Sequence, residues 1–271
     1  MNHILEKYDI VREINSGAFG KIYSGINKIT KDLVAIKIEV SENSLIKNEA
    51  RIYKFLERKN GIPSLRMYFS EVKYNYLVID LLGESLFSFK ERKKQNKDSN
   101  KNNIIQINTI YDIGIQLTNI LKDIHNMGII HRDIKPQNIV FDNDYKNIYL
   151  IDFGLAKKII YQLGNKSKLT HIKERNISNI IGSPNYISVN IHNLIEPSRR
   201  DDVISMIYVL FYLILDELPW KNLSNEKTLQ IKYNLINNNE YIEKYPRLIE
   251  QLYKVTVLGF ENKPDYNYII I

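Results

Sequence analysis

Two polar segments on either side of a short apolar hairpin constrain this chain of 271 residues more than any other feature. The first, residues 131–138, reads H-R-D-I-K-P-Q-N, and the second, D-F-G, begins at Asp152. Between them lie two apolar runs, 139–141 and 148–151, separated by acidic and amide residues that are typical of a turn. The pattern predicts a β-hairpin that carries Asn138 at one end and Asp152 at the other.

The polar side chains of these segments are those that a phosphoryl transfer from ATP requires. Such a transfer needs an acceptor for the proton of the attacking hydroxyl, a cation near the phosphates and oxygen ligands for Mg²⁺. Asp133 suits the first task and Lys135 the second, while Asn138 and Asp152 offer the hard oxygen donors that Mg²⁺ prefers. Taken alone, His131 is better explained as a core histidine and Asp152 as a turn residue. As a set, H-R-D-x-K-x-x-N followed by D-F-G matches the catalytic and metal-binding loops of protein kinases.

The N-terminal part of the chain predicts a small sheet with a glycine-bearing turn. Three β-rich runs, 8–14, 21–26 and 33–39, are separated by turn-forming residues. The turn at 15–20 reads N-S-G-A-F-G, which would let backbone N–H groups approach phosphates closely, although such a turn alone is weak evidence. The third run contains V-A-I-K, which ends at Lys37 and strengthens the interpretation as a phosphate site.

A carboxylate on the apolar face of the next predicted helix, 44–58, needs a partner. Leu45, Ile52 and Leu56 recur at helical spacing, and Glu49 falls on the same face. Burial of an unpaired charge is costly, so we expect Glu49 to meet Lys37, the pair that orients the lysine on the phosphates of ATP in protein kinases. The alternative is a glutamate at the rim of an amphipathic helix.

Beyond a strand pair near 66–70 and 75–80, a connector at 79–83 leads to a largely helical region. An apolar stripe predicts one helix that ends near Gly128, and its members are Ile110, Ile113, Leu117, Leu121 and Ile124. The apolar run 203–215 predicts a buried helix with Asp202 as its N-cap. Residues 90–103 are rich in Lys and Asn, which predicts an exposed, mobile loop.

Composition narrows the class of protein further. The hydrophobic content of 44% and charged content of 25% are ordinary for a globular protein, and no apolar run is long enough for a membrane helix. The absence of cysteine excludes disulfides and thiolate zinc sites. The N-terminus lacks the pattern of a signal peptide, so we expect an intracellular protein, cytoplasmic or nuclear. We attribute the net charge of +7 to solvated surface rather than to a nucleic-acid site, because no basic run is interleaved with aromatic residues.

Several stretches, one of which extends the D-F-G segment, carry a more specific pattern. They are G-I-P-S-L-R at 61–66, L-L-G-E-S-L at 81–86, D-F-G-L-A-K-K at 152–158, S-R-R-D-D at 198–202, L-P-W at 218–220 and K-P-D-Y-N-Y at 263–268. Residues 188–190 read S-V-N where most protein kinases carry A-P-E. These motifs resemble those of the casein kinase 1 family of serine/threonine kinases along nearly the whole chain.

The resemblance implies an α+β fold of two lobes that together form one protein kinase domain. The implied N-lobe, 1–83, is small and β-rich with one main helix, and the C-lobe, 84–271, is larger and helical. The resemblance also implies protein substrates with Ser or Thr acceptors, ATP and Mg²⁺ as cofactors, no membrane contact and a monomeric state. Asp133 and Lys135 are then the catalytic residues, and Asn138 and Asp152 the metal ligands. The implied nucleotide-binding residues are Ile14, Asn15, Ser16, Gly17, Ala18, Phe19, Gly20, Lys21, Ile22, Ala35, Lys37, Glu49, Asp80 and Leu82.

The sequence departs from the family at two sites. Asn15 replaces the first glycine of the phosphate loop; asparagine tolerates a left-handed backbone but is bulkier beside a nucleotide. The family's preference for acidic or pre-phosphorylated substrates is attributed to a basic site that here carries Ser178, Asn185 and Asp216, and only Arg175 is retained. The preference for primed substrates therefore does not carry over.

Three functions remain open from the sequence. The first is an active serine/threonine kinase, favoured because the complete set of polar residues is present. The second is a pseudokinase that binds nucleotide or partner proteins without efficient transfer, which Asn15 leaves open. The third is a small-molecule phosphotransferase of the same fold, which Lys135 and the segment G-S-P-N-Y at 182–186 disfavour.

Overall fold

The computed structural model describes residues 2–17, 20–42, 44–95, 105–162, 169–215 and 217–269. The chain forms two compact units, of which the first comprises Met1–Glu84 and Val140–Gly154, and the second Ser85–Ile139 and Leu155–Ile271. Each unit is described by itself. None of the helices within the described ranges has the length and apolar character that a membrane span requires.

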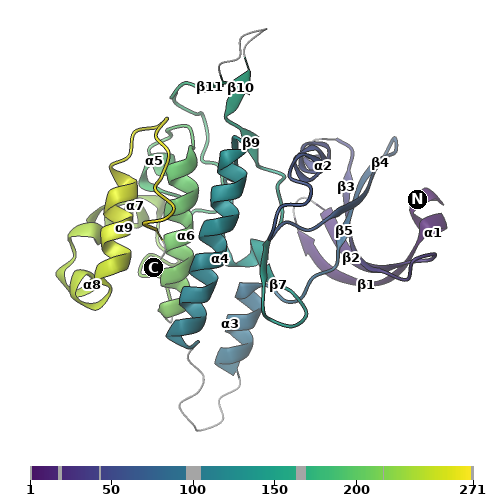
Figure 1. Cartoon of the computed structure of the whole chain (residues 1–271), viewed down its shortest axis with the longest axis horizontal. Coiled ribbons are helices and arrows are strands. Elements are labelled where there is room, and N and C mark those ends of the chain that lie inside the picture. The colour runs from purple at the N-terminus through teal and green to yellow at the C-terminus, as the bar shows by residue number, and fades with distance from the viewer. Residues whose placement is uncertain are drawn as a thin grey trace. The chain divides into compact units, whose positions relative to one another are not determined.

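The first unit is built on an antiparallel sheet of five strands in the order β1-β2-β3-β5-β4 (Figure 1). The strands are β1 (Tyr8–Gly17), β2 (Gly20–Asn27), β3 (Leu33–Val40), β4 (Leu65–Ser70) and β5 (Tyr74–Asp80). The short helix α1 (Asn2–Lys7) precedes them, and a hairpin of β7 (Ile139–Phe141) and β8 (Ile148–Leu150) lies farther along the chain. Alternate residues of β3 and β5 bury one face of the sheet, with Val34, Ile36, Tyr76 and Val78 in its core. The predicted strand pair, and the hairpin after Asn138, are confirmed.

The predicted turn at 15–20 is too long. Asn15 pairs with Ile22 and Ser16 with Lys21, so β1 and β2 continue to the pair Gly17 and Gly20. The pairing continues through these residues past a register shift between Glu13 and Asn15. Asn15 therefore lies in a strand, and its tolerance of a left-handed backbone is not used there.

Helix α2 (Ile46–Phe55) packs against β4 and β5 and is shorter than the predicted range 44–58. Its buried face includes Ile46, Glu49, Ile52 and Tyr53, which is the face that the spacing predicted. The side chain of Glu39 on β3 accepts hydrogen bonds from Ser44 Oγ and from the backbone N–H of Leu45, each at 2.9 Å. The start of α2 is thereby attached to the sheet.

The second unit is mainly helical. Its helices are α3 (Leu86–Gln95), α4 (Ile107–Asn126), α5 (Val189–His192), α6 (Arg199–Ile214), α7 (Asn225–Asn234), α8 (Asn239–Lys244) and α9 (Pro246–Thr256), with 3₁₀ turns η1 (Pro136–Asn138) and η2 (Leu235–Asn237). Short strands β6 (Ile129–Ile130) and β9 (Lys157–Lys158) pair with each other, as do β10 (Ile160–Gln162) and β11 (Leu169–His171). Helix α6 packs against both α4 and α9 (Figure 1). The predicted stripe of α4 is buried throughout, and Gly128 follows it with φ +75°, which confirms the predicted helix and its end.

Two sequence predictions about this unit are wrong. Asp202 is not the cap of α6, because Ser198 is the N-cap and forms a capping box with Asp201. Residues 90–95 are not a loop but the end of α3, and Lys90 is buried with its ammonium donating to the carbonyls of Tyr212 and Leu215. A lysine can cover apolar surface with its methylenes and bond the last carbonyls of a helix, which composition alone does not reveal. The rest of the predicted loop lies outside the described residues.

Candidate active site

A buried lysine with three carboxylates forms the first part of the site, within the first unit. Lys37 on β3 donates to Glu49 Oε2 of α2 at 2.8 Å and to Asp152 Oδ1 at 3.1 Å. Its ammonium also lies 3.3 Å from Glu39 Oε1. The predicted pair of Lys37 and Glu49 is therefore present, and Glu39 is an additional partner that the sequence analysis missed.

Burial and the charges of neighbouring groups both shift the pKa values of this cluster. Burial raises the pKa of Glu49 to about 7, against the opposing effect of Lys37 and with a further increase from Asp152. Burial alone would lower the pKa of Lys37, but Glu49 and Asp152 raise it above its ordinary value. Lys37 thus stays cationic, as a lysine that contacts phosphates must.

Asp152 is fixed in a left-handed backbone conformation, with φ +66°. Its backbone N–H donates to the hydroxyl of Tyr53 at 3.2 Å, and the ring of Phe153 packs edge-on against Tyr53 with 5.2 Å between centroids. The carbonyl of Gly154 accepts from Asn48 of α2. Helix α2 therefore holds the whole D-F-G segment, and the orientation of Asp152 depends on the packing of that helix.

The second part of the site lies in the second unit and centres on Asp133. Its Oδ2 accepts from Lys135 Nζ at 2.6 Å, and its Oδ1 accepts from Ser183 Oγ at 2.8 Å. Lys135 also donates to Ser183 Oγ at 3.2 Å, and Asn138 donates to the backbone carbonyl of Asp133 at 2.9 Å. Asp133, Lys135 and Asn138 are thus together as predicted, and Ser183 joins them. The sequence analysis used Ser183 only as part of a motif, although a hydroxyl beside a motif glycine was the available signal.

Asp202 binds the backbone of the loop that carries Asp133. Its two carboxylate oxygens accept from the backbone N–H groups of His131 and Arg132, at 2.7 and 2.8 Å. Oδ2 also lies 2.9 Å from Nε2 of the buried His125. Burial alone would raise the pKa of Asp202, but the contact with His125 lowers it. The aspartate that the sequence assigned to a helix cap therefore shapes the loop, and Arg132 keeps a left-handed φ of +71° within it.

Two buried side chains, Lys232 and Trp220, bind the backbone of the segment that carries Ser183. Lys232 of α7 is 2% exposed and donates to the carbonyls of Pro184 and Ile187, at 2.7 and 2.8 Å. Trp220 Nε1 donates to the carbonyl of Asn185 at 2.8 Å. Three carbonyls of this segment, at residues 184, 185 and 187, are thus bound by buried donors, which fixes the position of the Ser183 hydroxyl relative to Asp133.

The remaining predicted nucleotide residues lie in the first unit, mostly along the β1–β2 hairpin. Ile14, Asn15, Ser16 and Gly17 are on β1, and Gly20, Lys21 and Ile22 on β2. Ala18 and Phe19 lie outside the described residues. Ala35 is on β3, Leu82 follows β5, and the carboxylate of Asp80 accepts from Arg66 and from the backbone of Ser64.

The predicted magnesium ligands have suitable chemistry. Asn138 uses its amide nitrogen on Asp133, which directs its oxygen elsewhere, and Asp152 is a carboxylate with a partly exposed side chain. Both offer hard oxygen atoms. The described part of the chain holds no group of three or more His, Asp or Glu side chains that could bind a metal without the substrate. Asn138 and Asp152 each fit Mg²⁺ as single ligands by their chemistry.

One family model matches most of the chain. The protein kinase domain matches residues 8–257, which includes every residue of both parts of the site.

Proposed function

Because the chain belongs to the protein kinase domain family, we propose that it is a serine/threonine protein kinase of the casein kinase 1 type. It transfers the γ-phosphoryl group of ATP to Ser or Thr hydroxyls of protein substrates. The observation that carries the proposal is the arrangement of Asp133, which holds Lys135 on one carboxylate oxygen and Ser183 on the other.

The reaction needs the substrate hydroxyl to be oriented and its proton accepted. Asp133 is 8% exposed and has its carboxylate fixed by three donors, Lys135, Asn138 and Ser183, so it can hold an incoming hydroxyl at low reorganisation cost. The ammonium of Lys135, 2.6 Å from Asp133, supplies positive charge where the transferred group becomes more negative. Lys135 lies two residues after Asp133, a position that favours serine/threonine over tyrosine acceptors in the family that the chain resembles.

Lys37 binds the phosphates of ATP in this proposal, and Glu49 keeps its ammonium directed. Magnesium would be held by Asn138 and Asp152, where it neutralises phosphate charge and aligns the groups for in-line transfer. Glu39 contributes by attaching the start of α2 to β3, on which Lys37 lies. The pair of Lys37 and Glu49 is formed in the structure.

The alternative is a pseudokinase that binds nucleotide or a protein partner without efficient transfer. One observation favours it: Asn15 stands at the first glycine of the phosphate loop and adds a side chain to β1 there. It would lower nucleotide affinity but would leave the charged groups in place. An experiment has to separate transfer from binding.

The test is incubation of the purified chain with labelled ATP, Mg²⁺ and dephosphorylated casein, with Asp133→Asn as a matched control. We expect label on serine and threonine with the parent and almost none with the variant. Nucleotide binding without label on casein would support the pseudokinase. Consumption of ATP with label only on small acceptors would indicate a small-molecule phosphotransferase, and label on tyrosine would contradict the proposed specificity.

A further inference from the structure

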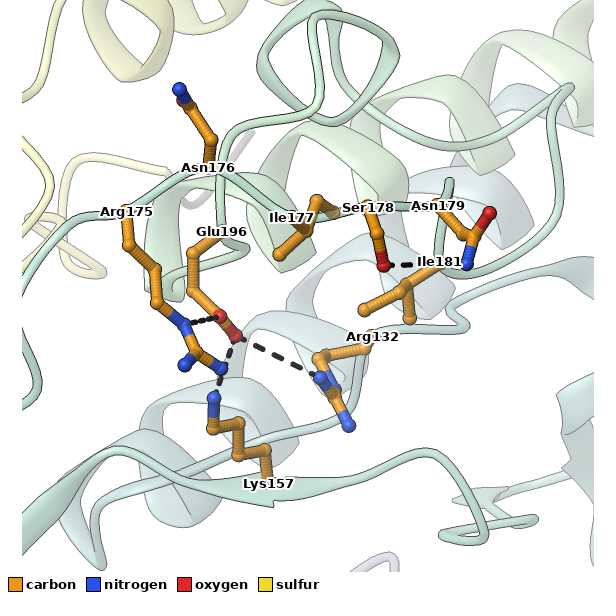
Figure 2. Close-up of a pocket in the computed structure, with 9 residues that line it drawn as sticks. All are labelled: Arg132, Lys157, Arg175, Asn176, Ile177, Ser178, Asn179, Ile181 and Glu196. Carbon is orange, nitrogen blue, oxygen red and sulfur yellow. Dashed lines mark hydrogen bonds and ion pairs between the residues drawn. The ribbon is translucent and has the colours of Figure 1, made fainter.

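A cluster of cations around one carboxylate lies beside the catalytic loop of the second unit. Arg132, Lys157 and Arg175 line a cavity of about 510 Å³ together with Glu196. In Figure 2 the three basic side chains come from different segments and point toward the carboxylate of Glu196. The established parts of the site do not use Glu196.

The contacts of Glu196 involve both of its oxygens. Oε1 accepts from Lys157 Nζ at 2.8 Å and lies 3.8 Å from Arg132 Nη1, while Oε2 accepts from Arg175 Nε at 2.8 Å. Glu196 is 1% exposed. Burial alone would raise its pKa, but Lys157 and Arg175 lower it below its ordinary value. The carboxylate is therefore an anion at neutral pH, with three cations around it.

The partners of Glu196 belong to segments that lie next to Asp133 or follow the D-F-G segment in the chain. Arg132 directly precedes Asp133 and donates through Nε to the carbonyl of Leu155 at 2.5 Å. Lys157 is on β9, which pairs with β6 just before the catalytic loop. The backbone N–H of Glu196 donates to the carbonyl of Arg175 at 2.9 Å, so the acid is itself anchored. One buried anion thus joins the catalytic loop to the strand and the loop that follow the D-F-G segment.

We propose that Glu196 is a positioning residue for the transfer reaction, a fixed internal counter-anion that holds Arg132, and through it Asp133, in the arrangement that the structure shows. The inference rests on the proposed kinase function. Removal of the carboxylate leaves three cations that repel one another at the edge of a cavity open to small ions. Arg132 then loses a counter-charge and the loop beside Asp133 loosens. An anion that enters from solution would restore the arrangement, because the site requires negative charge rather than a particular side chain.

The experiment compares Glu196→Ala with the parent and with Glu250→Ala, which removes an exposed glutamate and so matches the change in net charge. We expect Glu196→Ala to lower kcat about tenfold or more, as loss of a buried charged partner does, with little change in the KM for ATP. Sodium sulfate should restore at least half of the lost activity, whereas sodium chloride at equal ionic strength should not. Neither salt should raise the activity of the parent or of Glu250→Ala.

A second measurement keeps this inference separate from the kinase assignment. Sulfate should raise the thermal unfolding temperature of Glu196→Ala more than that of the parent, because only the variant has a vacant anion position. This result does not depend on transfer. An inactive parent would therefore count against the proposed function, whereas the effect of sulfate on the unfolding temperature would still show whether an anion takes the place of the Glu196 carboxylate. Glu196→Gln, which keeps the shape and loses the charge, serves if the alanine variant does not fold. Parent-like kcat in either folded variant, or lost activity and stability that sulfate does not restore, would overturn the proposal.

Discussion

Ser183 Oγ donates a hydrogen bond of 2.8 Å to Oδ1 of Asp133, from a segment 50 residues farther along the chain. The bond fixes the carboxylate together with Lys135, which binds the other oxygen. The hydroxyl at position 183 is therefore part of the geometry of the Asp133 carboxylate, the proposed catalytic group, and not only of the local turn.

Replacement of Ser183 by alanine should lower kcat by about 10- to 100-fold, because a hydrogen bond to a charged group contributes about 1.5 to 3 kcal/mol. Ser183→Thr keeps the hydroxyl and should retain most of the activity. Steady-state kinetics with casein and ATP measure both variants. An alanine variant within twofold of the parent would mean that Lys135 and Asn138 orient Asp133 without Ser183.

Asp133→Asn should abolish most transfer while nucleotide binding stays close to that of the parent. Asparagine keeps the shape of the side chain but does not accept the proton of the substrate hydroxyl, and loss of a general base costs about 10²- to 10⁴-fold in rate. Transfer is measured with labelled ATP, and binding by titration with a fluorescent nucleotide. Comparable turnover by variant and parent would remove Asp133 from its assigned role.

Lys37→Met should lower kcat strongly and also destabilise the first unit. It leaves Glu49 and Glu39 buried without their cation, and loss of one member of a buried ion pair costs about 3 to 5 kcal/mol. Addition of Glu49→Gln to this variant should recover part of the stability but no activity, because one of the two buried charges is removed while the phosphate contact stays absent. Urea unfolding and transfer assays on the single and double variants test the two effects separately. A full-rate Lys37→Met enzyme would show that another cation serves the phosphates.

The parts of the site that the sequence predicted are those held by local patterns. Asp133, Lys135 and Asn138 lie within six residues, so a motif places them, and Glu49 was predicted because a charge on an apolar helix face needs a partner. The contacts that the sequence did not predict join distant segments. Asp202 was assigned to a helix end from its neighbours, yet it binds the backbone of residues 131 and 132, about 70 positions away.

The burial of two lysines, Lys90 and Lys232, also could not be predicted from the sequence. Lys90 was assigned to an exposed loop, and nothing in the sequence around Lys232 marks it as buried, because lysine is usually exposed to solvent. Each instead donates to two backbone carbonyls, and such acceptors have no sequence signature because every residue carries one. The extent of the β1–β2 hairpin was missed for a related reason, since strand pairing beyond Ile14 depends on main-chain bonds more than on side-chain type.

Acidic conditions should destabilise the second unit through His192. Burial, with a further contribution from the nearby Lys232, lowers the pKa of His192 to about 4. His192 binds a proton near pH 6.5 in the unfolded chain but only near pH 4 in the folded chain. The free energy of unfolding therefore decreases as the pH falls through this window. His192→Gln lacks this contribution. Because His192 is partly exposed, we expect the stability difference between parent and variant to shrink by only about 1 kcal/mol between pH 7 and pH 5, measured by urea unfolding. A difference independent of pH would contradict the assignment to His192.

The last prediction concerns substrate choice, where the chain departs from the casein kinase 1 pattern. A phosphoserine upstream of the target carries up to two negative charges and needs charged donors for its recognition. Ser178 and Asn185 are neutral, position 216 lies outside the described residues, and the retained cation, Arg175, already donates to Glu196.

We therefore expect priming of a peptide to improve kcat/KM by less than about tenfold, or about 1.4 kcal/mol. The double change Asn185→Arg with Asp216→Gly adds a cation and removes an anion, so it should create a preference for primed peptides that weakens with salt. Matched peptides that differ only in one upstream phosphoserine measure both effects. A hundredfold gain from priming in the parent would show that a basic site persists elsewhere, because the neutral side chains at 178 and 185 supply no charge for such a gain.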